Sequence, residues 1–173
     1  MTEKITQFPG TPLREADFEG GKILFRHDRM KAEYAWDTGI AIGRYLAALK
    51  EGYLLGGYCA TCRKTVIPPR TVCEWCFRPM EAFVPLEDIG TVNTYSLCYV
   101  TWDVKRIKEP EIPAVIEIDG ASPLHGILHK LGEVEQEAVH VGMRVQAVWK
   151  PAEEREGAIT DILYFKPIEG GAK

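Results

Sequence analysis

The stretch Cys59-Ala-Thr-Cys62, followed ten residues later by Cys73-Glu-Trp-Cys76, decides the fold of this chain. Four of the five cysteines fall within these eighteen consecutive residues, as two Cys-x-x-Cys pairs. One such pair places two sulfurs on a tight turn. Two pairs close a tetrahedral cage of four sulfurs, which is the geometry of a structural zinc site. We therefore predict that Cys59, Cys62, Cys73 and Cys76 bind a metal ion.

Zinc is the ion that the pattern favours, with iron as the alternative. Four thiolates also hold a single iron, as in rubredoxins, or an iron–sulfur cluster. Rubredoxin-type knuckles usually carry Pro and Gly inside and after each pair, whereas here Ala-Thr and Glu-Trp fill the pairs, and Arg63 and Phe77 follow them. Four protein ligands leave no open position for water or substrate, so we expect a structural role. Disulfides or redox thiols are the other interpretation. The start of the chain shows no secretory apolar segment to support an oxidising compartment.

Length and composition are those of a soluble globular protein. The 173 residues allow one ordinary domain or two small ones, with 46% hydrophobic and 27% charged residues. No apolar run approaches the roughly 20 residues that span a bilayer, so we expect no membrane segment and a cytoplasmic location. Residues 59–81 have a net charge of +2, but residues 82–173 carry 9 basic and 15 acidic side chains, a net charge of −6. Such a field repels a phosphate backbone.

The N-terminal part, residues 1–52, is predicted as an arm followed by a helical segment. Residues 1–20 show no period and are expected to be irregular. A helical pattern begins near Met30, with Asp37 or Thr38 as the candidate N-cap and Gly39 as a candidate break, and it ends at Gly52, a natural C-terminal stop. Its apolar stripe consists of Ile42, Tyr45, Leu46 and Leu49. We favour packing of this stripe on the chain's own core, with docking of a partner protein as the alternative.

The remainder is predicted to be mainly β, with a rubredoxin-like zinc ribbon at 53–83 and an OB-fold domain at 84–173. Alternation and β-branched residues predict five barrel strands at 91–100, 114–118, 123–131, 143–149 and 157–165. A charged loop is expected at 102–113, and one or two helical turns at 133–139, between the third and fourth strands. This is the plan of a five-stranded OB-fold barrel. A small sandwich would also fit.

Several motifs together resemble one known family. They are the Cys pairs, Tyr45-Leu-Ala-Ala-Leu-Lys-Glu-Gly52, Pro68-Pro-Arg70, Gly90-Thr-Val-Asn-Thr-Tyr95, Val141-Gly-Met-Arg-Val145 and Tyr164-Phe-Lys-Pro167. The chain is similar, over about residues 40–167, to a zinc-ribbon plus OB-fold family known as a domain of unknown function. Members of that family occur beside thiolases and related acyl-CoA enzymes in bacteria and archaea. They often carry Gly after the second Cys of a knuckle, where this chain has Arg63 and Phe77.

The resemblance implies a non-catalytic accessory or scaffold protein. Its expected partners are acyl-CoA and thiolase-type or hydroxymethylglutaryl-CoA synthase-type enzymes, or acyl-CoA hydratases, in lipid, isoprenoid or polyketide metabolism. The four cysteines carry over as metal ligands, and no catalytic residue carries over. The sequence itself offers no Gly-x-Ser-x-Gly elbow, phosphate loop, dinucleotide fingerprint or His-Glu-x-x-His motif. We therefore expect no enzymatic activity.

A site for acyl-CoA needs cations for the phosphates and an apolar or aromatic face for the rest of the ligand. The candidate residues are Arg63, Lys64, Arg70 and Arg78 around the cage, and Trp102, Lys105 and Arg106 in the first long barrel loop. Ordinary surface charge is the competing interpretation of both groups. The alternative function is binding of single-stranded nucleic acid, a common task of OB-folds and zinc ribbons, but the acidic barrel segment disfavours it.

Overall fold

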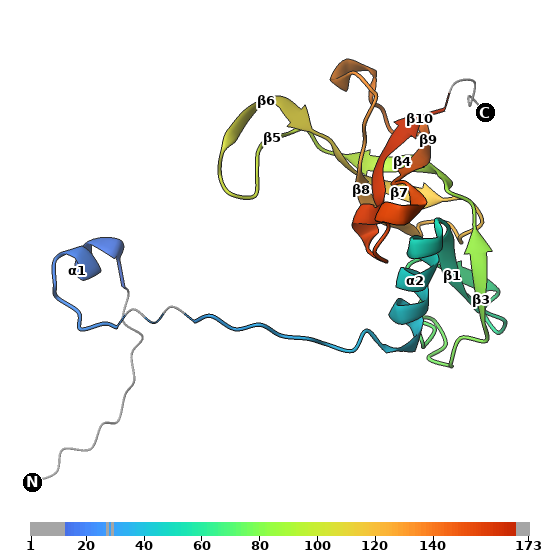
Figure 1. The fold of residues 1–173 in the computed structure, drawn as a ribbon, viewed down its shortest axis with the longest axis horizontal. Coiled ribbons are helices and arrows are strands. Elements are labelled where there is room, and N and C mark those ends of the chain that lie inside the picture. The colour runs from blue at the N-terminus through green and yellow to red at the C-terminus, as the bar shows by residue number, and fades with distance from the viewer. Residues whose placement is uncertain (1–12, 27, 29, 169–173) are drawn as a thin grey trace, which may run out of the picture. The chain divides into compact units, whose positions relative to one another are not determined.

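The computed structural model describes residues 13–26, 28 and 30–168, which fall into two units divided between Trp36 and Asp37 (Figure 1). The first unit contains one short helix, α1, at Glu15–Glu19. The prediction of an irregular arm over residues 1–20 is therefore wrong at this helix, and its first twelve residues lie outside the described part of the chain. Arg14 and Asp17 close the start of α1, because the Arg14 N–H donates to the Asp17 carboxylate at 3.1 Å.

The second unit begins with the long helix α2, Gly39–Glu51. The expected helical segment from Met30 is wrong, since residues 30–38 form no helix. The Asp37 carboxylate accepts the N–H of Gly39 at 2.8 Å, a local turn that fixes where the helix begins. The predicted end is confirmed. Gly52 has a φ of 87°, and its N–H donates to Leu49 O at 3.0 Å.

Helix α2 packs on the core of its own unit, the interpretation that the sequence favoured. Tyr45, Ala48 and Leu49 are buried and join the same apolar cluster as the barrel strands, and the partly buried Leu46 packs against it. Ile42, the first residue of the predicted stripe, is 39% exposed and is not part of this cluster. The helix contacts strand β1, Leu54–Cys59, which follows it directly. None of the helices in the described residues has the length and apolar character needed to cross a membrane.

A three-stranded antiparallel sheet of order β2-β1-β3 forms the ribbon, with β2 at Lys64–Val66 and β3 at Ala82–Leu86. The first Cys pair begins with Cys59, the last residue of β1, and ends with Cys62 in the turn before β2. The second pair lies in the segment between β2 and β3. The sheet therefore brings both knuckles to one end of the ribbon.

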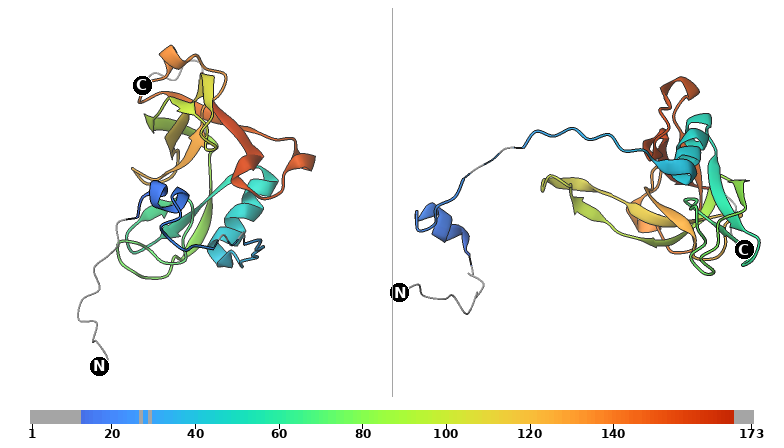
Figure 2. Two further views of the ribbon diagram at one scale, coloured as in Figure 1. Left: turned by 90° about the vertical axis from the view of Figure 1, so that its left-hand side faces the viewer. Right: turned by 90° about the horizontal axis from the view of Figure 1, so that it is seen from below.

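The barrel is a five-stranded antiparallel sheet of order β10-β9-β4-β7-β8. Figure 2 shows the ribbon diagram from two further sides. Its strands are β4 Ile89–Tyr95, β7 Pro113–Ile118, β8 Gly126–Lys130, β9 Arg144–Trp149 and β10 Ile162–Pro167. A bridge between Leu131 and Phe165 links the two ends of the sheet. The short helix η1, Gln136–Ala138, lies between the third and fourth barrel strands. The predicted mainly β fold, with a ribbon followed by an OB-fold, is confirmed.

Two strand assignments from the sequence need correction. The segment predicted as one strand at 91–100 is divided between β4 and β5, Cys98–Val100, and the predicted loop at 102–113 contains β6, Arg106–Glu111. β5 and β6 pair as a hairpin that projects from the barrel (Figure 1). Charges and prolines suggested a loop here. An edge strand, however, tolerates both. A proline such as Pro110 can lie where the ladder requires no N–H donor, and charged side chains can face solvent.

The fifth barrel strand also begins later than expected. The segment from Gly157 to Asp161 is a turn that ends in the short helix η3, Ile159–Asp161, and β10 starts only at Ile162. A further short helix, η2, occupies Ala152–Glu154. This loop contacts α2, and a Cβ on Gly157 would lie 3.1 Å from Leu46 O. The position therefore requires glycine for close packing, and the positive φ of 85° adds to that requirement.

Candidate metal centre and neighbouring cavity

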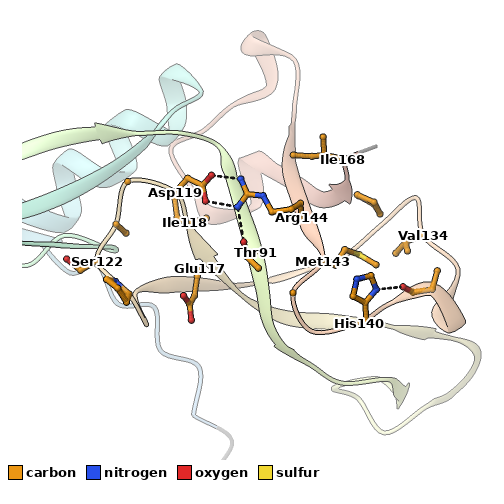
Figure 3. Close-up of a pocket in the computed structure, with 16 residues that line it drawn as sticks. Thr91, Glu117, Ile118, Asp119, Ser122, Val134, His140, Met143, Arg144 and Ile168 are labelled. Atoms are coloured by element: carbon orange, nitrogen blue, oxygen red, sulfur yellow. Dashed lines mark hydrogen bonds and ion pairs between the residues drawn. The ribbon is translucent and has the colours of Figure 1, made fainter. Parts of the chain in front are cut away.

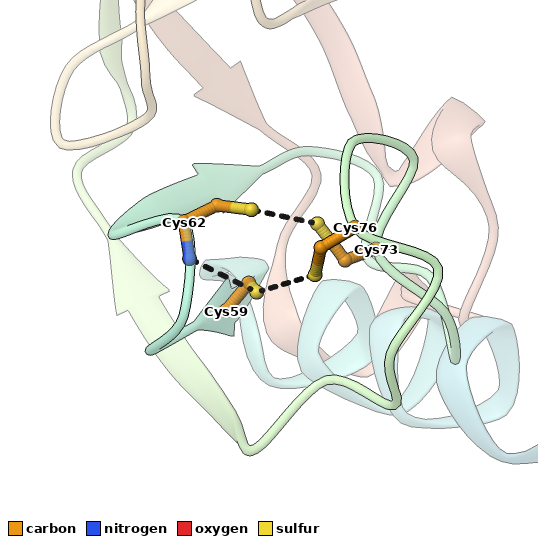
Figure 4. A group of neighbouring side chains, drawn as sticks. All are labelled: Cys59, Cys62, Cys73 and Cys76. Atoms are coloured by element: carbon orange, nitrogen blue, oxygen red, sulfur yellow. Dashed lines mark hydrogen bonds between the residues drawn. The ribbon is translucent and has the colours of Figure 1, made fainter.

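The four cysteines of the ribbon converge on one point (Figure 4). Their sulfur atoms all lie within 4.8 Å of one another. The Sγ atoms of Cys59 and Cys76 are 3.6 Å apart, and those of Cys62 and Cys73 are 3.7 Å apart. A tetrahedral ion with sulfur ligands at about 2.3 Å sets neighbouring sulfurs about 3.8 Å apart. All four are free cysteines, and the set is arranged to bind a metal ion.

The backbone of each knuckle supports this arrangement. The Cys62 N–H donates to Cys59 Sγ at 3.5 Å, and the Phe77 N–H donates to Cys73 O at 2.9 Å. Arg63 and Phe77, which follow the second cysteine of each pair, have φ angles of 54° and 56°. These are left-handed conformations that glycine adopts most easily. Both residues therefore hold a strained backbone that turns the chain out of the knuckle.

The thiols of the cage differ in their affinity for protons. The pKa of Cys62 is raised to about 12, first by its hydrogen bond with Cys76 and then by burial. Burial alone would raise the pKa of Cys73 too, but the N–H groups of Cys76 and Trp75 outweigh it and lower that pKa to about 7. Thiolates are the ligands that a metal needs, so binding must displace protons from the cage.

The second knuckle also contacts a loop of the barrel. Glu74 and Trp75, which fill the second Cys pair, both face His125. The His125 Nε2 atom lies 3.6 Å from a Glu74 carboxylate oxygen, and the imidazole packs edge-on against the Trp75 ring at 5.2 Å. Close by, the Ser122 N–H donates to Thr65 O at 2.8 Å, and the Thr65 N–H donates to Ser122 Oγ at 2.9 Å. The loop of residues 119–125 is thus fastened to the ribbon at two points.

That same loop lines a cavity of about 1320 Å³ in the barrel (Figure 3). Arg144 lies at its centre, where its guanidinium donates to Thr91 Oγ1 and to Asp119 Oδ1, both at 2.8 Å. The hydrogen bond with Asp119 is the main reason that the pKa of Arg144 is raised. The apolar part of the wall is formed by Val134, Ala138, Met143, Pro167 and Ile168. The cavity therefore combines the ion pair of Arg144 and Asp119 with an apolar surface.

The four cations predicted around the cage have different neighbours. Arg70 pairs with Glu74, Arg78 donates to Thr61 Oγ1 at 3.5 Å, and the Lys64 ammonium lies 5.8 Å from the centre of the Trp75 ring. Arg63 is exposed beyond the first knuckle. Their assignment as ligand-binding residues stays a prediction.

The other three predicted residues, Trp102, Lys105 and Arg106, lie together at the end of the β5–β6 hairpin. Lys105 Nζ is 2.7 Å from an Asp103 carboxylate oxygen, so its charge is already paired. Trp102 is 97% exposed. His125 and His129 contact different neighbours, since the His129 ring packs against the Phe165 ring at 5.7 Å while His125 faces the ribbon.

Sequence reasoning did not identify the cavity around Arg144. Arg144 lies at the start of β9 and Asp119 follows β7, and no strand pairing joins these two strands. One signal was present but received another interpretation, since Arg144 lies in Val141-Gly-Met-Arg-Val145, one of the motifs of the resemblance.

Comparisons with known proteins agree with this architecture. Residues 46–81 match the family model of the ChsH2 rubredoxin-like zinc ribbon domain, and residues 83–150 match that of the ChsH2 C-terminal OB-fold domain. A curated relative from Methanocaldococcus jannaschii, a DUF35 domain-containing scaffold protein, is 33% identical over 125 residues. That alignment covers 70% of this chain and 86% of the relative.

Two solved structures have a similar fold. One is a DUF35 family protein of unknown function from Sulfolobus solfataricus, with 24% identity and a TM-score of 0.55, covering 64% of this chain and 79% of that chain. The other is a chain of the Ltp2-ChsH2(DUF35) aldolase, with 20% identity and a TM-score of 0.56, covering 78% of this chain and 98% of that chain.

Proposed function

Because this chain belongs to the DUF35 family, we propose that it is a non-catalytic accessory protein that holds a thiolase-type enzyme. The observation that carries the proposal is the relative from Methanocaldococcus jannaschii, which is described as a scaffold protein and matches this chain over 86% of its own length. The association of a DUF35 chain with Ltp2 in an aldolase supports the same kind of role. A hydroxymethylglutaryl-CoA synthase-type enzyme is a second partner of this class.

Zinc is the ion that we propose for the cage, in a structural role. Four sulfurs at the observed spacing suit a tetrahedral ion and leave no ligand position for a substrate. The reduced cysteines suit the cytoplasm, where we place the protein. The ion would fix the two knuckles, so that the ribbon presents a stable surface beside the barrel.

Binding of acyl-CoA is the finer part of the proposal, for a role in lipid, isoprenoid or polyketide metabolism. The cations around the cage, Arg63, Lys64, Arg70 and Arg78, would meet the phosphates. Trp102, Lys105 and Arg106 would add an aromatic face and charge only where the hairpin lies against the partner enzyme, on a surface shared by the two proteins. Arg70 and Lys105 each have a carboxylate partner in this chain. We therefore expect measurable affinity for acyl-CoA mainly when the partner enzyme supplies the rest of the site.

The test is capture of partners by the tagged full-length protein from extracts of its own organism. We expect a thiolase-type enzyme, identified by mass spectrometry, that binds again when both proteins are purified. The isolated chain should leave acetyl-CoA intact. Turnover of the thioester by the isolated chain would refute the proposal. So would tight, salt-sensitive binding to single-stranded DNA without binding to a thiolase-type enzyme, which would favour the alternative function.

A further inference from the structure

The tip of the β5–β6 hairpin is apolar and is exposed in the part of the chain that the structure describes. Trp102, at 97% exposure, is the most exposed aromatic side chain among the residues that the structure describes. Val104 is 83% exposed beside it, and Tyr99 and Val100 are exposed on the strand that leads to the tip. An isolated two-stranded hairpin is marginally stable in water, so such a projection gains most when another surface covers it.

The tip is nevertheless held in one conformation. The Thr101 N–H donates to Lys105 O at 2.9 Å, and the Val104 N–H donates to Thr101 O at 3.0 Å. The Thr101 hydroxyl and the Lys105 ammonium both contact the Asp103 carboxylate and lower its pKa, the Lys105 contact being the larger cause. At the other end, the Tyr99 hydroxyl donates to Gln136 Oε1 at 2.8 Å. Trp102 is therefore displayed on an ordered turn, which lowers the entropic cost of binding.

Charge is distributed unevenly along the hairpin. The Asp103–Lys105 pair is neutral, and the next cations, Arg106 and Lys108, form no ion pair with any residue that the structure describes. Both are exposed and alternate with the half-buried Ile107, so they share one face of β6. Arg106 pairs across the hairpin with Val100 near the tip, whereas Glu111 pairs with Cys98 near the barrel. The tip is therefore positive and apolar.

We propose that this tip is the surface by which the chain grips a protein partner. Trp102 enters an apolar pocket of the partner, and Arg106 and Lys108 face carboxylates on the rim of that pocket. The inference rests on the proposed scaffold function and names the surface that performs it. Tryptophan and arginine dominate the energy of such contacts, because a large ring fills a pocket and a guanidinium pairs with carboxylates.

A protein fits this surface better than a lipid membrane. The hairpin as a whole has three cations, at positions 105, 106 and 108, against three carboxylates, at 103, 109 and 111, and the complete chain has a net charge of −4. An anionic lipid surface attracts clusters of several cations and repels such a chain. The projecting shape also argues against a small ligand bound by this chain alone, since neither the barrel cavity nor a smaller cavity beside α2, lined by Arg44 and Phe83 among others, includes a hairpin residue.

The experiment measures binding of the full chain to the thiolase-type enzyme that it captures, with both proteins purified, by calorimetry. Trp102→Ala should weaken the affinity at least about 30-fold, as truncation of a central hot-spot residue does. Leu128→Ala, which removes a 68% exposed side chain from the barrel strand β8, is the matched control and should leave the affinity unchanged. In surface plasmon resonance, Arg106→Glu should slow association and reduce the dependence of the association rate on salt, while Glu109→Lys near the barrel should not.

The possible outcomes separate this inference from the proposed function. If the wild-type chain binds the enzyme and Trp102→Ala binds equally well, the hairpin is not the docking surface and the scaffold function stands. If no thiolase-type enzyme binds the wild-type chain, both proposals fail. The wild-type chain could instead sediment with vesicles of phosphatidylcholine and phosphatidylserine while Trp102→Ala does not. That result would assign the tip to a membrane and overturn the inference. Circular dichroism should show that each variant folds.

Discussion

Replacement of Asp161 by Asn should destabilise the protein by about 3 kcal/mol. Asp161 is fully buried, and its Oδ2 accepts the N–H groups of Gly157 and Ala158 at 2.7 and 3.0 Å. Its Oδ1 accepts the N–H of Glu156 at 3.1 Å and lies 3.8 Å from the Lys150 ammonium. An asparagine keeps only one oxygen, so its NH₂ group must face a donor. Losing one hydrogen bond to a buried charge costs about 1.5–3 kcal/mol, and the two that remain become weaker.

The assay is urea unfolding of the metal-loaded protein, followed by tryptophan fluorescence. In thermal unfolding of a chain of this length, a loss of about 3 kcal/mol in the free energy of unfolding corresponds to a fall in the melting temperature of about 10 °C. Glu153→Gln removes the same charge from an exposed position of the same loop and should change the stability by less than about 0.5 kcal/mol. If Asp161→Asn and Glu153→Gln lower the free energy of unfolding equally, or if Asp161→Asn lowers it by less than about 1 kcal/mol, the Asp161 carboxylate does not hold the loop.

Acid gives an independent check of the same contact. Burial alone would raise the pKa of Asp161, but the N–H groups of Glu156, Ala158 and Gly157, with Lys150, outweigh it and lower the pKa. A lowered pKa means that the unfolded chain binds the proton first. The contribution of the carboxylate is therefore complete above the unfolded value of 3.8 and is lost as the pH falls through the folded value. The stability difference between wild type and Asp161→Asn should shrink below about pH 4.

Three further predictions concern the cage and the barrel. Phe77→Gly should stabilise the metal-loaded protein by about 0.5–1 kcal/mol in urea unfolding, because it relieves a left-handed backbone, whereas Phe77→Ala should give no gain. Removal of the metal by a chelator should unfold the ribbon and therefore speed hydrogen exchange of the Ser122 amide, which donates to Thr65 O. An unchanged exchange rate would mean that the loop at 119–125 does not depend on the cage. Burial lowers the pKa of His129, so the unfolded chain takes up the proton first as the pH falls below 6.5, and stability falls with it. His129→Gln should therefore unfold with a shallower dependence on pH between about pH 7 and pH 5.

Local rules were sufficient where a residue acts on its own neighbours. The spacing of the Cys pairs placed four sulfurs on one point, and Gly52 ended α2 because only a residue that tolerates positive φ fits there. Alternation predicted β7, whose Ala114, Ile116 and Ile118 are buried. The extension of the helical pattern back to Met30 was wrong, because α2 begins at Gly39, directly after the N-cap candidates Asp37 and Thr38, and Asp37 makes a turn with Gly39.

Tertiary contacts decided the features that the sequence did not indicate. The projecting hairpin depends on pairing across a turn, and its charges and Pro110 resembled those of a loop. Arg144 meets Asp119 only because the barrel brings the start of β9 to the end of β7. No short-range pattern joins two residues that lie 25 positions apart. The cavity was therefore outside the reach of motif reasoning, although Arg144 stood in one of the motifs of the resemblance.

The contacts of the loop at 119–125 extend the expected effect of the metal beyond the ribbon. One side of this loop carries His125, which packs on Trp75 between two ligands of the cage. The other side carries Asp119, which holds Arg144 in the cavity. A cage without its ion would release the second knuckle from the first, because the ion is bound by both Cys pairs. The loop would then lose the ring contact and the hydrogen bonds of Ser122 with Thr65, so the cavity wall should loosen together with the cage.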